Sequence, residues 1–474
     1  MRNKFLELKK KCILNKNKII LSYLNQLTNN IKHNFFKNNH FQIPQKEVQF
    51  YFKKKLLDNF NFSKNIFNNK ISILSVPKYI IIYLVYVLRI ILLRKKGIIK
   101  VTYYKTMIDH IESDKELNLY KKIISLYKKK DIIIRTANPN VQHKQSIFFS
   151  KMKDYIITNK DIIFLIKFFF SALNISLKYR INFFYISLKF IDDCFFYKSF
   201  FKQIKPKNII MHQHYYSNNI KNFFFKKNGG NKSCLIQKNI NTKNTNGFFY
   251  HADILFSFGA NINISNKRTS SKIKRNVNIG SFVMGSKKGI VLRKNKRNID
   301  LLYIGGNGLF KNSYYDTYDT YKNDYIEQLK WLAKISIKFP KLKIYFKHHP
   351  NNYENEEKVF FINSNVKFID QKKNTYHLCD QSKFICSWAS TMIIEYKYKN
   401  YYSFFLDPKN NNDQFLSDIN KRHEISIDNY NKFEQLVLSS QNKIYKNKQD
   451  KNFCMTNKNM FNNIFKNLDY KNRL

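Results

Sequence analysis

Short apolar runs alternate with helix-like segments between residues 343 and 408. The runs lie at residues 344–346, 366–369, 384–386 and 402–406, and a helix-like segment separates the last two. Strands that alternate with helical segments indicate βαβ units, and therefore a parallel sheet. In such sheets ligands bind where strands end and helices begin. The residues at those positions are therefore the first candidates for function.

Polar residues follow two of these runs. Lys347, His348 and His349 come directly after the first run, and Ser390 and Thr391 lie in the turn before the helix-like segment. Hydroxyl groups and the free N–H groups of a helix start suit phosphate oxygens, and an imidazole can donate to a phosphate or a leaving group. We therefore predict a phosphate site here. The alternatives are a helix cap at the hydroxyls and strand-end histidines without a ligand.

Two further features fit the same site. Glu395 lies one helical turn after Thr391 and faces the same way, so its carboxylate could accept both hydroxyls of a ribose. The alternative for Glu395 is an ion pair with Lys399, four residues on. Gly305 and Gly306 follow another apolar run, where glycine permits close approach of a ligand to the backbone; the alternative is a simple turn.

The charge of the chain is high but dispersed. Of 474 residues, 85 are Lys or Arg and 32 are Asp or Glu, which gives a net charge of +53. Lys, Asn, Ile, Phe and Tyr are over-used together along the whole chain, as expected from an AT-rich coding sequence. We therefore predict no dedicated nucleic-acid face, although such a surface should adhere to anionic membranes and polyanions.

Location is predicted from three features. The six cysteines form no C-x-x-C pair, which fits a reducing compartment. The N-terminus lacks the apolar core and cleavage site of a signal peptide. The most apolar run, residues 79–93, is short for a membrane span and contains Arg89, so it is either a buried helix or a helix in the membrane surface. We expect a cytoplasmic protein, either free or at the inner face of the cell membrane.

The pattern along the chain predicts four segments. Residues 1–70 form a peripheral basic helical segment, residues 71–285 an N-terminal domain, residues 298–442 a C-terminal domain, and residues 443–474 a tail with a helix. In the first domain, apolar runs at 131–135, 208–211, 233–237 and 252–258 predict strands. Residues 107–129 have helical spacing, and residues 161–200 predict one or two packed helices.

These motifs carry a family resemblance over roughly residues 200–410. Lys347-His348-His349-Pro350, Ser390-Thr391 with Glu395, and Asp407-Pro408 occur in the order found in bacterial surface-carbohydrate and capsule-polysaccharide biosynthesis proteins. More distantly, the chain resembles the polysialyltransferase and CDP-glycerol glycerophosphotransferase group. The resemblance implies a GT-B-like α/β fold, with two Rossmann-like domains whose parallel sheets face a central cleft.

The resemblance also implies a reaction. It predicts a metal-independent glycosyltransferase that moves a sugar or polyol phosphate from a nucleotide-activated donor to a glycan or lipid-linked acceptor in capsule or lipopolysaccharide assembly. No cofactor is expected besides the nucleotide-sugar co-substrate. The implied donor-phosphate ligands are His349, Ser390, Thr391, Lys347, Gly305 and Gly306, and the implied ribose ligand is Glu395.

The catalytic base is the least defined part of this prediction. The polysialyltransferase-like group uses an acidic pair before a glycine, which this chain lacks, because Asp192-Asp193 precedes Cys194 inside an apolar segment. His214 follows a predicted strand and is the first candidate base, alongside His349 at the donor site, and His212 is the next. The other interpretations of the chain are a nucleotide-sugar 2-epimerase, a non-catalytic relative and a charge-driven nucleic-acid binder.

Overall fold

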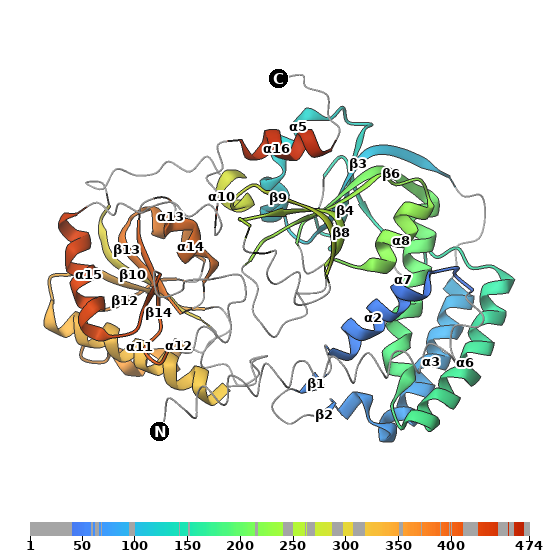
Figure 1. The fold of residues 1–474 in the computed structure, drawn as a ribbon, viewed down its shortest axis with the longest axis horizontal. Coiled ribbons are helices and arrows are strands. Elements are labelled where there is room, and N and C mark those ends of the chain that lie inside the picture. Colours follow the sequence, from blue (N-terminus) through green and yellow to red (C-terminus); the bar gives the residue numbers. More distant parts are fainter. Residues whose placement is uncertain are drawn as a thin grey trace. The chain divides into compact units, whose positions relative to one another are not determined.

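The structure is a computed structural model, and it divides the chain into two compact units (Figure 1). The first unit comprises Met1–Ile236, Phe249–Leu255 and Ser271–Arg275, and the second the remaining residues. The residues that the structure describes are 40–57, 60–61, 66–67, 69–93, 100–141, 143–149, 152–213, 217–239, 250–260, 262, 271–286, 297–306, 318–349, 354–370, 372–388, 390–397, 399, 401–410, 425–443, 454 and 459–468.

A seven-stranded sheet carries the first unit, in the order β5-β4-β3-β6-β7-β8-β9. The pairings of β3 with β4 and β6, of β4 with β5, and of β6 with β7 are parallel. Its strands are β3 (Thr102–Ile111), β4 (Ile132–Thr136), β5 (Ser146–Phe148), β6 (Ile204–Met211), β7 (Lys232–Ile236), β8 (His251–Ser257) and β9 (Lys272–Asn278).

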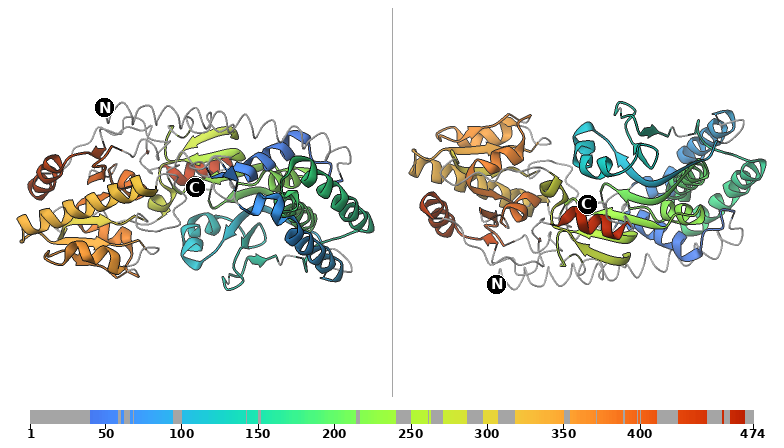
Figure 2. Two further views of the ribbon diagram at one scale, coloured as in Figure 1. Left: turned by 90° about the horizontal axis from the view of Figure 1, so that it is seen from below. Right: turned by 90° about the horizontal axis from the view of Figure 1, so that it is seen from above.

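Helices gather beside this sheet, as Figures 1 and 2 show for α2, α3, α6 and α7. Helix α7 is the centre of the group because most of its aromatic side chains are buried, and it contacts α2, α3, α6 and α8. The elements outside the sheet are α2 (Gln45–Leu57), β1 (Phe60–Asn61), β2 (Ile66–Phe67), η1 (Asn69–Ile71), η2 (Ile73–Ser75), α3 (Val76–Leu93), α4 (Asp114–Leu119), α5 (Lys121–Leu126), α6 (Asn159–Tyr179), α7 (Phe183–Gln203) and α8 (Asn219–Lys227).

A six-stranded sheet carries the second unit, in the order β12-β11-β10-β13-β14-β15, and all its pairings are parallel. Its strands are β10 (Ile299–Ile304), β11 (Ile344–Lys347), β12 (Lys367–Phe368), β13 (Ser382–Ser387), β14 (Tyr402–Leu406) and β15 (Ser426–Ile427). The helices are α10 (Phe282–Ser286), α11 (Tyr318–Lys338), α12 (Glu354–Lys358), η6 (Val359–Phe361), α13 (Thr375–Asp380), α14 (Thr391–Lys397), α15 (Tyr430–Asn442) and α16 (Met460–Asn467).

Both faces of the second sheet are buried. Along β10, Leu301 and Tyr303 pack into the core formed with α11 and α15, whereas Leu302 and Ile304 pack into the core formed with α13 and α14. Successive side chains of a strand point to opposite faces, so a strand covered on both sides must be apolar throughout. The apolar runs of the sequence are therefore strands, and the predicted α/β fold with two Rossmann-like parallel-sheet domains is confirmed.

Two predictions about the first unit need correction. Residues 107–111 are not helical but complete β3, and the helices that follow are the short α4 and α5. Of the two alternatives for the run 79–93, the fully buried helix is wrong, since Leu84, Leu88 and Leu92 of α3 are 53%, 56% and 69% exposed. Residues 161–200 do form two packed helices, α6 and α7, as predicted.

Candidate functional site

The carboxyl ends of β11, β10 and β13 lie next to one another in the second sheet. Ile304 of β10 pairs with Lys347 of β11 on one side and with Ser387 of β13 on the other. The residues that follow these strands therefore share one edge. Gly305 N–H donates to the Lys347 carbonyl at 2.8 Å. A Cβ at Gly305 would lie 3.2 Å from the backbone of the adjoining His pair, so only glycine fits here without a shift.

The two histidines at the end of β11 differ in surroundings. His348 is buried, and its Nδ1 lies 3.5 Å from Oε2 of the fully buried Glu357. Glu357 also accepts a hydrogen bond from Tyr325 at 2.6 Å. His349 is half-buried, and burial together with the neighbouring His348 lowers its pKa. His349 is therefore neutral at pH 7, and its ring can donate one hydrogen bond and accept another.

The hydroxyl groups at and after the end of β13 have different hydrogen-bond partners. Ser387 is buried and donates to the Ile304 carbonyl at 2.7 Å, which ties β13 to β10. Ser390 is half-buried, and its hydroxyl oxygen accepts from the Met392 N–H at 3.3 Å, so it caps α14. Thr391 is half-buried at the first position of α14. Of the predicted phosphate ligands, His349, Ser390, Thr391, Gly305 and Gly306 follow three neighbouring strands.

Two other predicted ligands are held inside the unit. Glu395 is 4% exposed; it accepts hydrogen bonds from the hydroxyl of Ser281 and from that of Tyr376, the latter at 3.0 Å. Its burial leaves little of the carboxylate accessible to a ribose. Lys347 is 5% exposed and donates to the Asp370 carbonyl at 2.6 Å. The candidate base His214 lies outside the described residues.

A buried acidic pair near this edge has no counterpart in the sequence predictions. Trp388, directly after β13, donates its indole N–H to Asp324 of α11, and the Lys409 N–H donates to the same carboxylate at 3.2 Å. Asp407, at the end of β14, is also buried. Burial and the charge of Asp407 raise the pKa of Asp324 to about 7. Asp324 can therefore exchange a proton near neutral pH.

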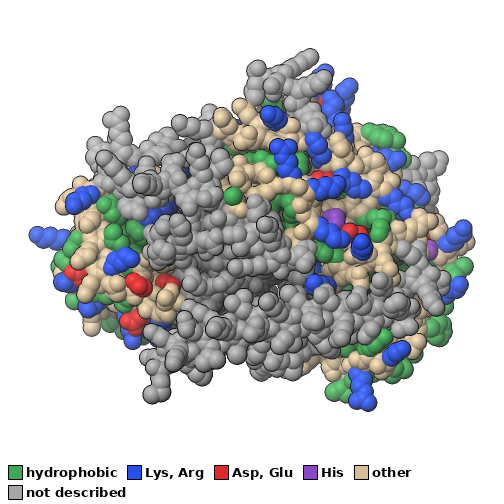
Figure 3. Space-filling model, viewed as in Figure 1, with side chains coloured by type: hydrophobic (Ala, Val, Ile, Leu, Met, Phe, Trp, Pro, Cys, Tyr) green, Lys and Arg blue, Asp and Glu red, His purple; other side chains and the backbone are tan. Residues whose placement is uncertain are grey.

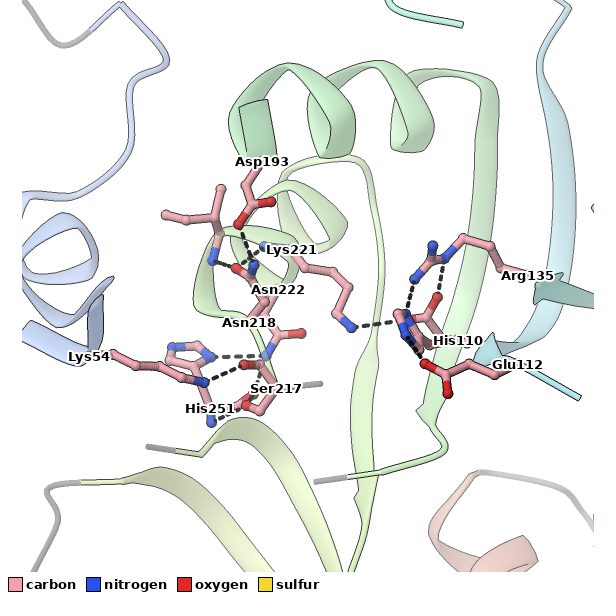
Figure 4. Close-up of polar contacts among 12 residues, drawn as sticks. Lys54, His110, Glu112, Arg135, Asp193, Ser217, Asn218, Lys221, Asn222 and His251 are labelled. Carbon is pink, nitrogen blue, oxygen red and sulfur yellow. Dashed lines mark hydrogen bonds and ion pairs between the residues drawn. The ribbon is translucent and has the colours of Figure 1, made fainter. Parts of the chain in front are cut away.

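The first unit holds a buried ion cluster at the corresponding strand ends (Figure 4). Asp109 of β3 is fully buried and accepts hydrogen bonds from Arg135 of β4 and, at 2.7 Å, from Lys221 of α8. These two cations are 7% and 1% exposed. They hold the pKa of Asp109 well below its usual range despite burial. One carboxylate thus serves two buried cations.

His110 lies beside this cluster in an unusual conformation. Its φ of 66° is left-handed, and the register between β3 and β4 shifts there, which marks a β-bulge. His110 Nδ1 lies 3.4 Å from Arg135, and its Nε2 lies 3.1 Å from Glu112. Burial and the charge of Arg135 lower the pKa of His110 to about 4, although Asp109 opposes the effect.

His212, the further candidate base, is held firmly in the first unit. It is 2% exposed, with Nδ1 3.0 Å from the Tyr120 hydroxyl and Nε2 3.1 Å from Glu116. The two neighbouring carboxylates of α7, Asp192 and Asp193, are also buried, and Asp192 accepts from the Tyr155 hydroxyl at 2.6 Å. In the part of the chain that the structure describes, no group of three or more His, Cys, Asp or Glu is placed to hold a metal ion.

Comparison of the sequence with protein-family models and with characterised proteins gives no match. Solved structures resemble it distantly. A UDP-N-acetylglucosamine 2-epimerase is 10% identical over 79% of this chain and 98% of its own, with a TM-score of 0.43. The wall teichoic acid polymerase TagF is 10% identical over 78% and 93%, with a TM-score of 0.38. Acinetobacter baumannii MurG is 10% identical over 72% and 95%, with a TM-score of 0.33. These likenesses concern the fold, and function depends on the chain's own residues.

Proposed function

We propose that the protein is a glycosyltransferase of GT-B type that moves a sugar or polyol phosphate from a nucleotide-activated donor to a surface glycan. The observation that supports it best is the shared edge of β11, β10 and β13. There Gly305 brings the backbone close to His349, while the hydroxyls of Ser390 and Thr391 follow the adjoining strand. Ligands of parallel sheets bind at this edge.

The residues of this edge would contact different parts of the donor. The exposed part of His349 donates to a phosphate oxygen, which stabilises the charge that develops on the leaving nucleotide. The hydroxyls of Ser390 and Thr391 donate to the same phosphates. Gly305 and Gly306 leave room for the pyrophosphate against the backbone. A metal ion is not needed for these contacts, and the acceptor would bind in the first unit.

Nucleotide binding tests the donor site. We expect one of CMP, CDP, UDP and GDP to raise the melting temperature of the wild-type protein. The double variant His349→Ala, Ser390→Ala should bind that nucleotide at least about tenfold more weakly, because it lacks two phosphate donors. A thermal-shift titration of both proteins measures this difference.

The control for this titration is His377→Ala. His377 lies on α13 in the same unit and contacts Gln381, away from the strand ends. Its removal should leave nucleotide binding unchanged. If no nucleotide stabilises the wild type, or if the double variant binds as well as the wild type, the donor site is wrong. Turnover of a nucleotide sugar without any acceptor would instead indicate a 2-epimerase.

We also propose that the protein works on a membrane surface, docked through α3 and α6. The two helices touch, since the Tyr83 hydroxyl of α3 donates to the Leu165 carbonyl of α6 at 2.7 Å. Both expose apolar side chains, including Leu84, Leu88 and Leu92 on α3, next to exposed cationic residues such as Arg89. By length and composition alone, the segments Ile73–Leu93 and Asn159–Tyr179 could also cross a membrane, as could core helices of soluble proteins.

Vesicle flotation tests this docking. We expect the wild type to float with vesicles that contain an anionic phospholipid, and less with neutral ones, because exposed cations of these helices such as Arg89 attract the anionic head groups. The triple variant Leu84→Ser, Leu88→Ser, Leu92→Ser should reduce vesicle binding at least about tenfold, since each leucine that enters the membrane contributes to the affinity. Ile337→Ser is the control, because Ile337 is 60% exposed on α11 of the other unit. Equal losses in both variants would contradict the proposal.

A further inference from the structure

A cavity of about 250 Å³ opens in the first unit beside the carboxyl end of β3 and the start of α8. Helix α2 contributes Lys54 and Lys55, the end of β3 contributes His110, and the start of α8 contributes Asn218 and Lys221. Parallel α/β sheets bind ligands at the carboxyl ends of their strands, and His110 lies at such an end. Figure 4 shows Lys54 against Ser217, and Lys221 extending toward the end of β3 beside His110.

The cavity carries an excess of positive charge. Lys54, Lys55, Lys189 and Lys221 line it, and Asp193 is the one carboxylate among the described lining residues. Asp193 is already bound by Lys189 and by Asn218, the latter at 2.9 Å. Cations that outnumber carboxylates in a partly enclosed site attract anions more strongly than they would in open water.

The buried cluster behind the cavity leaves this excess unchanged, because Asp109 and Arg135 have opposite charges and Lys221 is already counted in the lining. Asp109 carries one negative charge, and Lys221 and Arg135 carry two positive ones, all within the protein interior. Burying an uncompensated charge is costly. An anion in the cavity next to Lys221 would supply the missing charge. The bulge at His110 turns this side chain toward the cavity lining, as bulges do near functional sites.

The remaining walls of the cavity suit a sugar ring. Phe50, Tyr51 and Tyr197 supply aromatic surface, and Ser217 and Asn219 supply hydroxyl and amide groups. Aromatic faces pack against the C–H groups of sugars, while the amides and hydroxyls pair with sugar hydroxyls. The volume is below the roughly 300–1,000 Å³ of pockets for drug-sized ligands, which fits a single sugar unit.

A neighbouring cavity of about 490 Å³ has a smaller excess of positive charge, with three lysines and two carboxylates in its lining. Lys226 and Lys274 contact Asp253 at 2.6 and 2.8 Å, and Lys272 contacts Glu47 at 2.6 Å, so each of these lysines has a carboxylate within the lining. Figure 3 shows Lys and Arg side chains over this part of the surface, around α8 and β9. An anionic ligand here would have to compete with Asp253 and Glu47 for these lysines.

We propose that the 250 Å³ cavity binds an acidic sugar unit, one that carries a carboxylate or a phosphate, of the glycan acceptor. The acceptor role rests on the proposed glycosyltransferase function, whereas the binding of the acidic sugar does not. The anionic group contacts Lys54, Lys55 and Lys221, and the sugar ring packs against Tyr51.

Direct binding of simple sugars tests this inference without any nucleotide. Calorimetric titrations at about 0.15 M salt would compare glucuronic acid, glucose 6-phosphate and glucose, because at this salt concentration charges farther away than the roughly 8 Å screening length contribute little. We expect at least one acidic sugar to bind about tenfold more tightly than glucose. The tighter of the two identifies carboxylate or phosphate as the recognised group.

Matched variants locate the binding. The double variant Lys54→Gln, Lys55→Gln should bind the acidic sugar about tenfold more weakly. Lys221→Met, the second variant, should also bind it more weakly. Lys272→Gln in the neighbouring cavity is the control and should bind as the wild type does. Equal affinity for glucose and the acidic sugars, no binding of either acid, or an equal loss in the control would each overturn the proposal. If acidic sugars bind while every nucleotide fails, the cavity stands and the donor site does not.

Discussion

Replacing Asp109 by Asn is expected to lower the free energy of unfolding of the first unit by about 3–5 kcal/mol. The substitution keeps the shape of the side chain but removes its charge. Arg135 and Lys221, both buried, would then face each other with no anion between them. Urea unfolding followed by far-UV circular dichroism measures the change, since both tryptophans of the chain lie in the other unit.

An exposed ion pair of the same unit provides the control. Asp131 pairs with Lys105 at 2.9 Å, and the side chain of Lys105 is 65% exposed. Asp131→Asn should therefore change stability by only about 0–1 kcal/mol. Adding Lys221→Met to Asp109→Asn should restore part of the loss, because the net buried charge returns to its original value. If Asp109→Asn costs no more than Asp131→Asn, water must already solvate the cluster.

The second unit could be predicted from the sequence because its central strands coincide with apolar runs that are visible locally. Strands β10, β11 and β13 contain short apolar runs that are buried on both faces, and residues of the shared edge, such as Gly305 and His349, follow them closely in the sequence. What could not be predicted is how side chains engage one another across the fold. Glu395 and Ser281 are 114 residues apart, and no local pattern links them. The partner of Trp388 was missed for the same reason.

The first unit was harder to predict. The bulge at His110 breaks the strict alternation of β3, so its apolar residues resemble helical spacing. The charges of its buried cluster come from separate elements, with Asp109 and Lys221 112 residues apart. One signal was present: Asp109-His110 ends an apolar run, as His348-His349 does. Applying the same reasoning to both would have marked this strand end.

The structure also separates two kinds of positive charge. Most lysines among the described residues are exposed and fit the expected compositional bias of the chain. Arg135 and Lys221 are not, because burial makes each charge costly and bias alone would not retain it. In a chain with a net charge of +53, burial rather than number identifies the cations that serve the fold or a ligand.

Replacing Asp324 by Asn is expected to stabilise the second unit above pH 7 and to flatten its pH dependence. The pKa of Asp324 is about 7 in the folded protein, against 3.8 ordinarily. Between these values the folded state keeps a proton that the unfolded state has released. The wild type therefore loses stability as pH rises from about 4 to 7, by roughly 4 kcal/mol. Trp388 and the Lys409 N–H donate to different oxygens of Asp324, and Asn has only one side-chain oxygen. The substitution therefore loses one of these hydrogen bonds, the one from Lys409, which costs about 1 kcal/mol. The expected net gain at pH 8 is roughly 3 kcal/mol.

Tryptophan fluorescence during urea unfolding measures this gain, because Trp331 and Trp388 report on the second unit alone. The difference between variant and wild type at each pH isolates the contribution of Asp324. Glu434→Gln is the control: Lys338 lowers the pKa of Glu434, which stays charged throughout this range and adds no slope. A variant that parallels the wild type from pH 5 to 8 would mean that Asp324 is ionised in the folded protein, and that Trp388 and Lys409 outweigh its burial beside Asp407.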